Sequence, residues 1–284
     1  MSPEEVHERR LADLRRFTRA IREQEPLHVI KFNDGEWHAM AGRGGANCDN
    51  HKYSGRLQKE MRSAYRELRS SAFISDYIVN HSMHPQHNRL AEKIGLPRNW
   101  FVNFAMLHHR PYRGRFDCRT HELKEFYRAI RDDPRMKIFI GPKRLQPDVF
   151  LQTTQRIDVP MSNAFDVIGR LSVAATSIAK QVSPVFLTSC GFSSCILARD
   201  ILRVNPSATV IDLGSALDPI LFGITRSAQL STQELRDFYS DFGCDWPRMP
   251  HFYASIPGGF NFADVYAEMV DRFGGGQFVE VGSW

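Results

Sequence analysis

The sequence lacks the long apolar runs that mark membrane-spanning proteins. None of its hydrophobic stretches approaches the roughly 20 residues that a helix needs to cross a bilayer. Its first thirty residues are charged and helical in pattern, which does not fit a secretory signal peptide. From these absences we expect a soluble protein that stays in the cytoplasm.

Cysteine is scarce, and its spacing follows no metal-binding or disulfide pattern. The chain has five scattered cysteines and no Cys-x-x-Cys pair. This argues against a disulfide framework and a zinc site, and we expect reduced thiols. Cys190 follows a predicted strand, but the Gly-x-Ser/Cys-x-Gly spacing of a nucleophile elbow is absent around it. We therefore expect Cys190 to be a buried structural residue.

The chain also lacks internal repeats and low-complexity linkers, so we predict a single domain over residues 1–284. Residues 1–225 would form an α/β core, and the aromatic-rich segment 226–284 would form either an acceptor pocket or a packed C-terminal subdomain. A hydrophobic fraction of 42% and a charged fraction of 24% are ordinary for a globular protein. The net charge of +5 and the pI near 9.0 favour anionic partners, namely sugar nucleotides, lipid phosphates or nucleic acid.

Short apolar segments alternate with amphipathic ones along the chain. The predicted strands are 28–32, 73–79, 100–104, 137–142, 155–160, 185–188 and one starting near 208. The predicted helices are one from residue 2, then 56–69, 120–131, 191–203 and 263–273. This alternation is typical of an α/β protein with a mostly parallel sheet and helices on both faces.

The segment 28–37 carries the first candidate site. His28–Phe32 is predicted to be a buried strand that ends in the turn Asn33-Asp34-Gly35. Ligands collect beyond the carboxyl ends of parallel strands, and residues two apart in extended chain project to the same side. Asp34 and Glu36 would then bind one Mg²⁺ or Mn²⁺ ion, with Gly35 allowing close approach of the bound group. The alternative is an ordinary turn with an Asp-x-Glu spacing that arose by chance.

A second candidate site follows the strand Val185–Thr188. Gly191, Ser193 and Ser194 form a tight turn into a helix, which exposes unpaired N–H groups at the positive end of the helix dipole. This geometry binds phosphate. The glycine-rich segment 41–45 lacks the Lys-Ser/Thr ending of a P-loop, so we expect a mobile loop at the rim of the site.

These segments resemble motifs of GT-D-type glycosyltransferases. Lys31-Phe-Asn-Asp-Gly-Glu-Trp37 is similar to the Arg-Phe-Gly-Asp-Gly-Glu-Phe signature of that family, whose Asp-x-Glu motif serves a metal-dependent sugar-nucleotide site. Further elements follow in the family's order: Arg110-Pro-Tyr112, a strand ending at Gly141, Arg156-Ile157 with Pro160, Asn163-Ala-Phe165, Gly191–Ser194 and Asp212-Leu-Gly214. The sequence departs from the family at Lys31, at Phe192 and at Ser215-Ala-Leu217.

The resemblance implies a Rossmann-like GT-D fold and transfer of a sugar from a nucleoside diphosphate donor, with UDP as the expected nucleotide. Asp34 and Glu36 would hold Mn²⁺ or Mg²⁺. The expected donor-binding residues are Lys31, Gly35, Arg110, Asn163, Gly191, Ser193 and Ser194. The alternative for Asn163 is a helix cap. The alternative for Arg110 is a surface residue without a role in binding. Asp218 is predicted to be the general base, with a simple Asp-Pro turn as the alternative.

The acceptor is left open between two classes. A glycan or glycolipid is the usual acceptor in the family. The basic pI also admits a hydroxymethylated base in phage DNA, which would have to be reached outside the base stack and would place the protein in the host cytoplasm. Two alternatives to a transferase are a metal-dependent hydrolase of nucleotides or phosphoesters and a non-catalytic nucleotide-binding module.

Three histidines, His81, His84 and His87, have a spacing that invites comparison with a transition-metal site. Pro85 argues against a shared helical face for the three rings. We therefore expect a solvated loop here.

Overall fold

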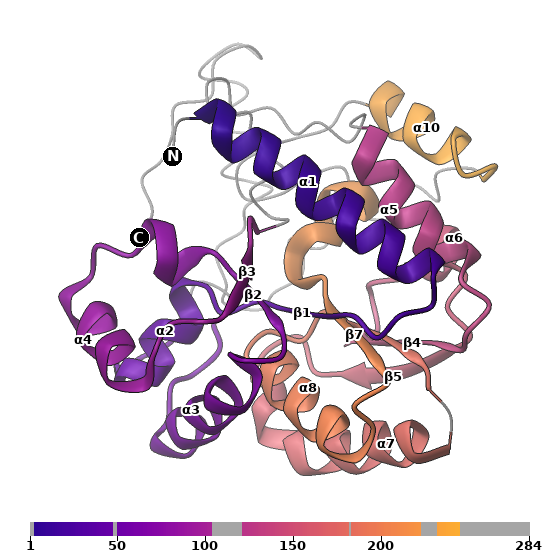
Figure 1. Ribbon diagram of the computed structural model, residues 1–284. Coiled ribbons are helices and arrows are strands. Elements are labelled where there is room, and N and C mark those ends of the chain that lie inside the picture. The colour runs from indigo at the N-terminus through magenta and orange to yellow at the C-terminus, as the bar shows by residue number, and fades with distance from the viewer. Residues whose placement is uncertain (1–2, 48–49, 104–120, 182, 223–231, 245–284) are drawn as a thin grey trace, which may run out of the picture.

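The computed structural model describes residues 3–47, 50–103, 121–181, 183–222 and 232–244 (Figure 1). Its described strands form one seven-stranded sheet with the order β3-β2-β1-β7-β6-β4-β5, in which every neighbouring pair is parallel. The strands are β1 His28–Ile30, β2 Phe73–Ser75, β3 Asn99–Phe101, β4 Lys137–Pro142, β5 Gln155–Val159, β6 Val185–Thr188 and β7 Thr209–Asp212. The predicted parallel sheet is confirmed.

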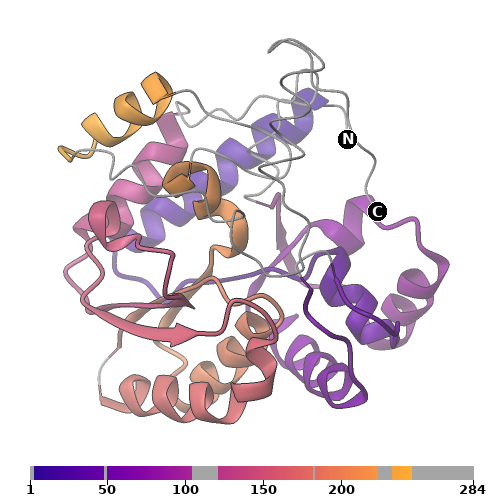
Figure 2. The ribbon, with the colours of Figure 1, turned by 180° about the vertical axis from the view of Figure 1, so that it is seen from behind.

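Helices cover both faces of this sheet (Figures 1 and 2). One face carries α1 Pro3–Arg22, α5 His121–Asp132, α6 Asp148–Leu151 and α10 Thr232–Ser240. The other carries α3 Gly55–Leu68, α7 Ile168–Gln181 and α8 Ser193–Val204. The remaining described elements are α2 Asp34–Ala41, a π-helical turn Tyr77–His81, α4 Pro85–Ile94, the 3₁₀ turns Ala164–Val167 and Gly214–Leu217, and α9 Asp218–Phe222. No described helix has the length and apolar character needed to span a membrane.

The sheet separates two hydrophobic cores. Side chains alternate along a strand, so neighbouring residues of one strand enter opposite cores. In β7, Ile211 packs in the core under α1 and α5, and Val210 packs in the core under α3 and α8. Because both faces are buried, the central strands are apolar throughout, which made them recognisable in the sequence.

The structure corrects the sequence prediction at β2 and at α2. Strand β2 ends at Ser75, and the residues predicted to extend it form the π-helical turn. Asp34 is the first residue of helix α2, so the extended geometry predicted for Asp34 and Glu36 is wrong. The helix forms because Glu36 Oε2 accepts a hydrogen bond from the backbone N–H of Asn33 at 2.9 Å, as in a capping box.

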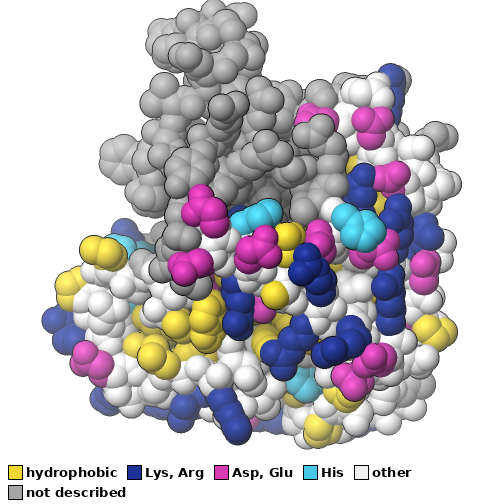
Figure 3. All heavy atoms as spheres, turned by 45° about the horizontal axis from the view of Figure 1, so that its top comes forward, with side chains coloured by type: hydrophobic (Ala, Val, Ile, Leu, Met, Phe, Trp, Pro, Cys, Tyr) yellow, Lys and Arg dark blue, Asp and Glu magenta, His cyan; other side chains and the backbone are white. Residues whose placement is uncertain are grey.

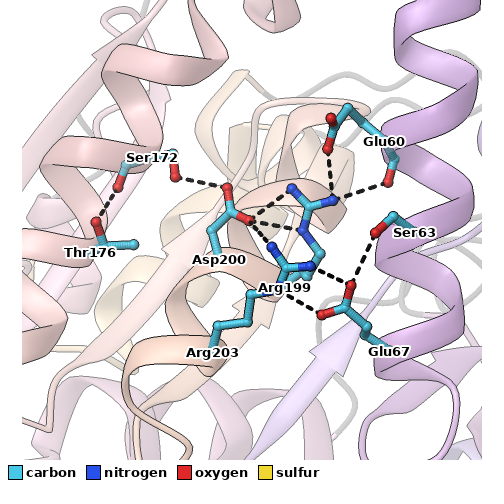
Figure 4. A network of polar contacts seen from close by, with 8 residues as sticks. All are labelled: Glu60, Ser63, Glu67, Ser172, Thr176, Arg199, Asp200 and Arg203. Carbon is cyan, nitrogen blue, oxygen red and sulfur yellow. Dashed lines mark hydrogen bonds and ion pairs between the residues drawn. The ribbon is translucent and has the colours of Figure 1, made fainter.

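Helix α8 is fixed to its neighbours by a network of ion pairs (Figure 4). Arg199, only 7% exposed, pairs with Glu60 of α3 and with Asp200, and Asp200 also accepts a hydrogen bond from Ser172 of α7. Nearer the surface, Arg203 pairs with Glu67. The network holds the helix whose N-terminus lies at the candidate site.

Candidate functional site

The carboxyl ends of β1, β7 and β6 are neighbours in the sheet, and the two candidate sites meet there. A Cβ atom added to Gly35 would lie 3.2 Å from Cε1 of Phe192. The turn that opens α8 therefore packs directly against the Asp34-Gly-Glu36 segment that opens α2. The structure brings the predicted metal ligands and the predicted phosphate-binding turn together.

Asp34 and Glu36 occupy the first turn of α2. Asp34 is exposed, whereas Glu36 is partly exposed but its carboxyl group is closely surrounded by protein atoms. This burial, together with the charges of Asp34 and Asp212, raises the pKa of Glu36 to about 8. Carboxyl groups are thus concentrated at the carboxyl ends of β1 and β7.

Asp212, to which the sequence analysis assigned no role, supplies the third carboxylate. It is 4% exposed at the end of β7, and its Oδ1 accepts a hydrogen bond from Gly214 N–H at 3.1 Å. Burial raises the pKa of Asp212, and the nearby Lys31 charge acts in the opposite direction. An acidic residue at a strand end was visible in the sequence, but only the pairing of β7 with β1 places it beside Glu36.

Lys31 lies at the end of β1, where it is 6% exposed. Its Nζ donates a hydrogen bond to the carbonyl oxygen of Leu213 at 2.9 Å. Gly214 has a φ of +50°, and a Cβ atom there would lie 1.8 Å from this Nζ. Lys31 therefore joins the loops after β1 and β7 and places a cation beside Asp212; its predicted contact with a donor stays a prediction.

The turn before α8 differs in detail from the predicted one. The N–H groups of Ser193 and Ser194 donate to Cys190 O at 3.3 Å and Gly191 O at 3.0 Å. In contrast, the N–H groups of Gly191 and Phe192 have no hydrogen-bond partner within the described ranges. Gly191 is exposed and has a φ of +56°, so of the predicted residues Gly191 keeps an N–H group open to an anion, whereas the N–H groups of Ser193 and Ser194 do not.

The two serines of this turn are buried. Ser194 Oγ accepts from Cys190 N–H at 3.3 Å, which stabilises the turn itself. Ser193 is 1% exposed, and its Oγ has no hydrogen-bond partner. A buried hydroxyl without a partner is costly, and Thr188 Oγ1 at the end of β6 is a second one.

Asn163 follows β5 in the left-handed region, with φ at +54°. Its side chain does not cap the following 3₁₀ turn, so the capping alternative is wrong. Instead, Oδ1 accepts from Lys52 N–H at 2.8 Å, and Asn163 N–H donates to His51 Nδ1 at 3.0 Å. The polar segment after the predicted rim loop 41–45 is anchored here: Ala46 forms a β-bridge with Lys52, and Tyr53 N–H donates to Gly45 O at 2.8 Å.

Two further predicted residues remain untested. Arg110 lies outside the described residues. Asp218 begins α9 and is 7% exposed, one 3₁₀ turn beyond the end of β7. Its predicted role as general base stays a prediction.

The predicted solvated histidine loop is wrong for His87. Pro85 starts helix α4 instead of interrupting one, and His87 is fully buried. Its Nε2 lies 3.0 Å from His38 Nδ1, and its Nδ1 lies 3.1 Å from the hydroxyl of Tyr77. Burial and the neighbouring His38 lower the pKa of His87 to about 4, so the ring is neutral at physiological pH. In the part of the chain that the structure describes, no three His, Cys, Asp or Glu side chains are arranged to hold a metal by themselves.

Solved structures provide the similarity that sequence comparison does not. No protein family and no curated protein matches the sequence. A DUF1792 glycosyltransferase from Streptococcus sanguinis aligns over 78% of this chain and 90% of its own, with a TM-score of 0.52 and 15% identity. A domain of unknown function 1792 described as having a distinct glycosyltransferase fold aligns over 79% and 88%, with a TM-score of 0.51 and 16% identity. The protein therefore has the fold of the DUF1792 glycosyltransferases, which confirms the GT-D-type fold predicted from the sequence.

Proposed function

We propose that the protein is a metal-dependent glycosyltransferase. It would transfer a sugar from a nucleoside diphosphate sugar, with UDP as the first nucleotide to test, to a hydroxyl acceptor. The contact between Gly35 and Phe192 carries this proposal, because it joins clustered carboxylates to an anion-binding turn at one edge of the sheet. The similarity of fold to DUF1792 glycosyltransferases supports it.

The carboxylates fit a hard divalent cation. Asp34 and Asp212 are close enough to Glu36 for their charges to raise its pKa, and a bound cation would favour the charged form of this carboxyl group. Mg²⁺ and Mn²⁺ prefer such oxygen ligands and keep part of their shell for water and substrate phosphate. Asp34 and Glu36 would hold the cation, which when bound offsets negative charge on the leaving diphosphate.

Protein groups on the other side of the site would bind the diphosphate. The N–H groups of exposed Gly191 and of Phe192, which have no hydrogen-bond partner among the described residues, lie at the positive end of the α8 dipole. Donors that are fixed in this way do not have to reorganise when negative charge develops during the reaction, and so they stabilise that charge. The ion pairs of Arg199 keep α8 in the position that this role needs.

A glycan or glycolipid is the acceptor class that we propose. A DNA acceptor would call for a broad basic surface. On the face shown in Figure 3, basic side chains lie among acidic ones. On α1, Arg15 and Arg22 pair with Glu122 and Glu125 of α5. Asp218 is the proposed base for the acceptor hydroxyl, and the proposed acceptor segment 226–284 lies largely outside the described residues.

A screen of UDP- and GDP-sugars with Mn²⁺ tests this function. A ligand that binds the folded state raises its melting temperature, which identifies the donor, and product analysis with candidate acceptors then identifies the reaction. Sugar transfer to the acceptor supports the proposal. Free sugar or sugar phosphate produced equally well without acceptor would indicate the hydrolase, and stabilisation without any turnover would indicate the binding module.

A further inference from the structure

Helix α2, which carries Asp34 and Glu36, packs against helix α4 through histidine side chains (Figure 1). His38 lies one turn after Asp34 on α2, and His87 lies on α4. The centroids of the two rings are 4.5 Å apart, and His38 Nδ1 lies 3.0 Å from His87 Nε2. Because residues four apart share one face of a helix, Asp34 and His38 lie on the same face of α2.

The hydrogen bonds of His38 have a fixed direction. The guanidinium group of Arg43 lies 3.1 Å from His38 Nε2, and arginine can only donate, so Nε2 is the acceptor. Burial lowers the pKa of both His38 and His87, against the opposing charge of Asp34, so both rings are neutral at physiological pH. The single N–H proton of the His38 ring therefore lies on Nδ1 and is donated to His87 Nε2.

His87 continues this chain of hydrogen bonds in the same direction. Its Nε2 is an acceptor, so its proton lies on Nδ1, 3.1 Å from the hydroxyl oxygen of Tyr77. His87 is fully buried, and rotation of its ring would break the bonds on both sides. The chain thus connects α2 to α4 and to the π-helical turn that follows β2.

Helix α2 needs such contacts because it has only eight residues, too few to be stable without tertiary packing. Trp37 is one contact: it is fully buried, and its ring centroid is 5.2 Å from that of Tyr65 on α3. Apolar packing has no fixed direction. The hydrogen bond of His38, the next residue along the helix, adds the directional contact that fixes how α2 is rotated about its own axis.

We propose that His87 is a positioning residue for the metal-binding carboxylates, and that it acts through the hydrogen bond that it accepts from His38. This inference rests on the proposed function, in which Asp34 and Glu36 hold the cation. A change in the rotation of α2 moves both carboxylates relative to Asp212. Residues that orient metal ligands from behind typically change metal affinity by about 10-fold to 100-fold when they are substituted.

Two pairs of substitutions separate this role from packing. The amide group of asparagine reaches the position of Nδ1 of histidine, and that of glutamine reaches the position of Nε2. His87→Gln therefore keeps the bond between the two side chains and His87→Asn loses it, whereas His38→Asn keeps the bond and His38→Gln loses it. Asparagine is the poorer helix former, so an effect of helix stability alone would rank asparagine below glutamine at both positions.

The dissociation constant of Mn²⁺ from the full chain, measured from the electron paramagnetic resonance of unbound Mn²⁺, is the test. We expect His87→Asn and His38→Gln to weaken binding about tenfold. His87→Gln and His38→Asn should remain within about threefold of the wild type. The control is His84→Asn, which should not change binding, because exposed His84 contacts both other rings but has no side-chain hydrogen bond among the described residues.

The tautomer of His38 gives a second readout, which needs no metal. We expect the ¹⁵N spectrum of the wild type to show the His38 proton on Nδ1. This signature should persist in His87→Gln and become a mixture of tautomers in His87→Asn. A His38 proton on Nε2 in the wild type would overturn the proposal.

The order of the four variants decides the inference. Asparagine weaker than glutamine at both positions, or equal Mn²⁺ binding by all four, would overturn it. If buried His87→Asn does not fold, the pair at the partly exposed His38 decides.

Failure of this inference differs from failure of the proposed function. If Asp34→Asn abolishes Mn²⁺ binding but the expected order of the pairs is not found, the metal site stands and His87 is a packing residue. If the order is found but no nucleotide sugar is turned over, the positioning role stands and the transferase does not. If the wild type binds no Mn²⁺, the inference falls together with the metal site.

Discussion

The ammonium group of Lys31 occupies the space that a side chain at Gly214 would need. Its Nζ lies 1.8 Å from the position of an added Cβ, and Gly214 has a φ of +50°. Two separate requirements therefore select glycine at this position. The loop after β7 is thereby packed against the Lys31 ammonium group, which lies beside Asp212.

Gly214→Ala should consequently destabilise the protein. The methyl group would strain the backbone and displace Lys31 from Leu213, and we expect a loss of about 2 kcal/mol in the free energy of unfolding. Urea unfolding measures this. Gly169→Ala is the matched control, because Gly169 lies in α7 with nothing within 4 Å of an added Cβ, and alanine there should stabilise the helix by about 0.5–1 kcal/mol. Equal effects at the two positions would contradict the prediction.

The two arginines of α8 should contribute very differently to stability. Arg199 is 7% exposed and pairs with Glu60 and Asp200, so Arg199→Met would leave carboxylates without their partner and should cost about 2–3 kcal/mol. Arg203 is 53% exposed, and loss of its pair with Glu67 should cost less than about 1 kcal/mol. Chemical denaturation of the two variants, one controlling for the other, tests this order; a larger loss for Arg203→Met would contradict it.

The stability should fall in mild acid because His87 is buried as a neutral ring. Its pKa is about 4 in the folded protein and about 6.5 in the unfolded chain. The unfolded state therefore binds the proton first, and the folded state loses stability as the pH drops from about 6.5 towards 4. His87→Gln should flatten the curve of unfolding free energy against pH in this window. A curve as steep as that of the wild type would show that other groups dominate the acid response.

The sequence predicted the sheet well because its central strands are buried on both faces, and so each appears as a short apolar run. It failed at α2, where Asn33-Asp34-Gly35 is both a turn signal and the start of a capped helix. An acidic residue at position 36 fits both a turn and the first turn of a helix. Its hydrogen bond to Asn33 N–H is part of the capping box with which the chain continues as a helix.

The site was predicted in part. Asp34, Glu36 and Gly191 lie in local patterns, so they could be found from the sequence. Asp212 and His87 could not, because their importance comes from contacts between distant segments: β7 pairs with β1, and His87 lies beside His38. Local periodicity carries no information on either contact.

The most direct test of the transferase is the double substitution Asp34→Asn with Glu36→Gln. Glutamine can still accept the hydrogen bond from Asn33 N–H, so the variant should fold, and the exposed pair Glu92→Gln with Asp166→Asn controls for the change in charge. The measurement is the turnover of the donor sugar found in the screen, with and without Mn²⁺. We expect metal-dependent transfer to fall at least about 100-fold while the melting temperature stays near that of the wild type and the control stays active. Undiminished metal-dependent transfer by the folded double variant would contradict the assignment of the cation to these two carboxylates.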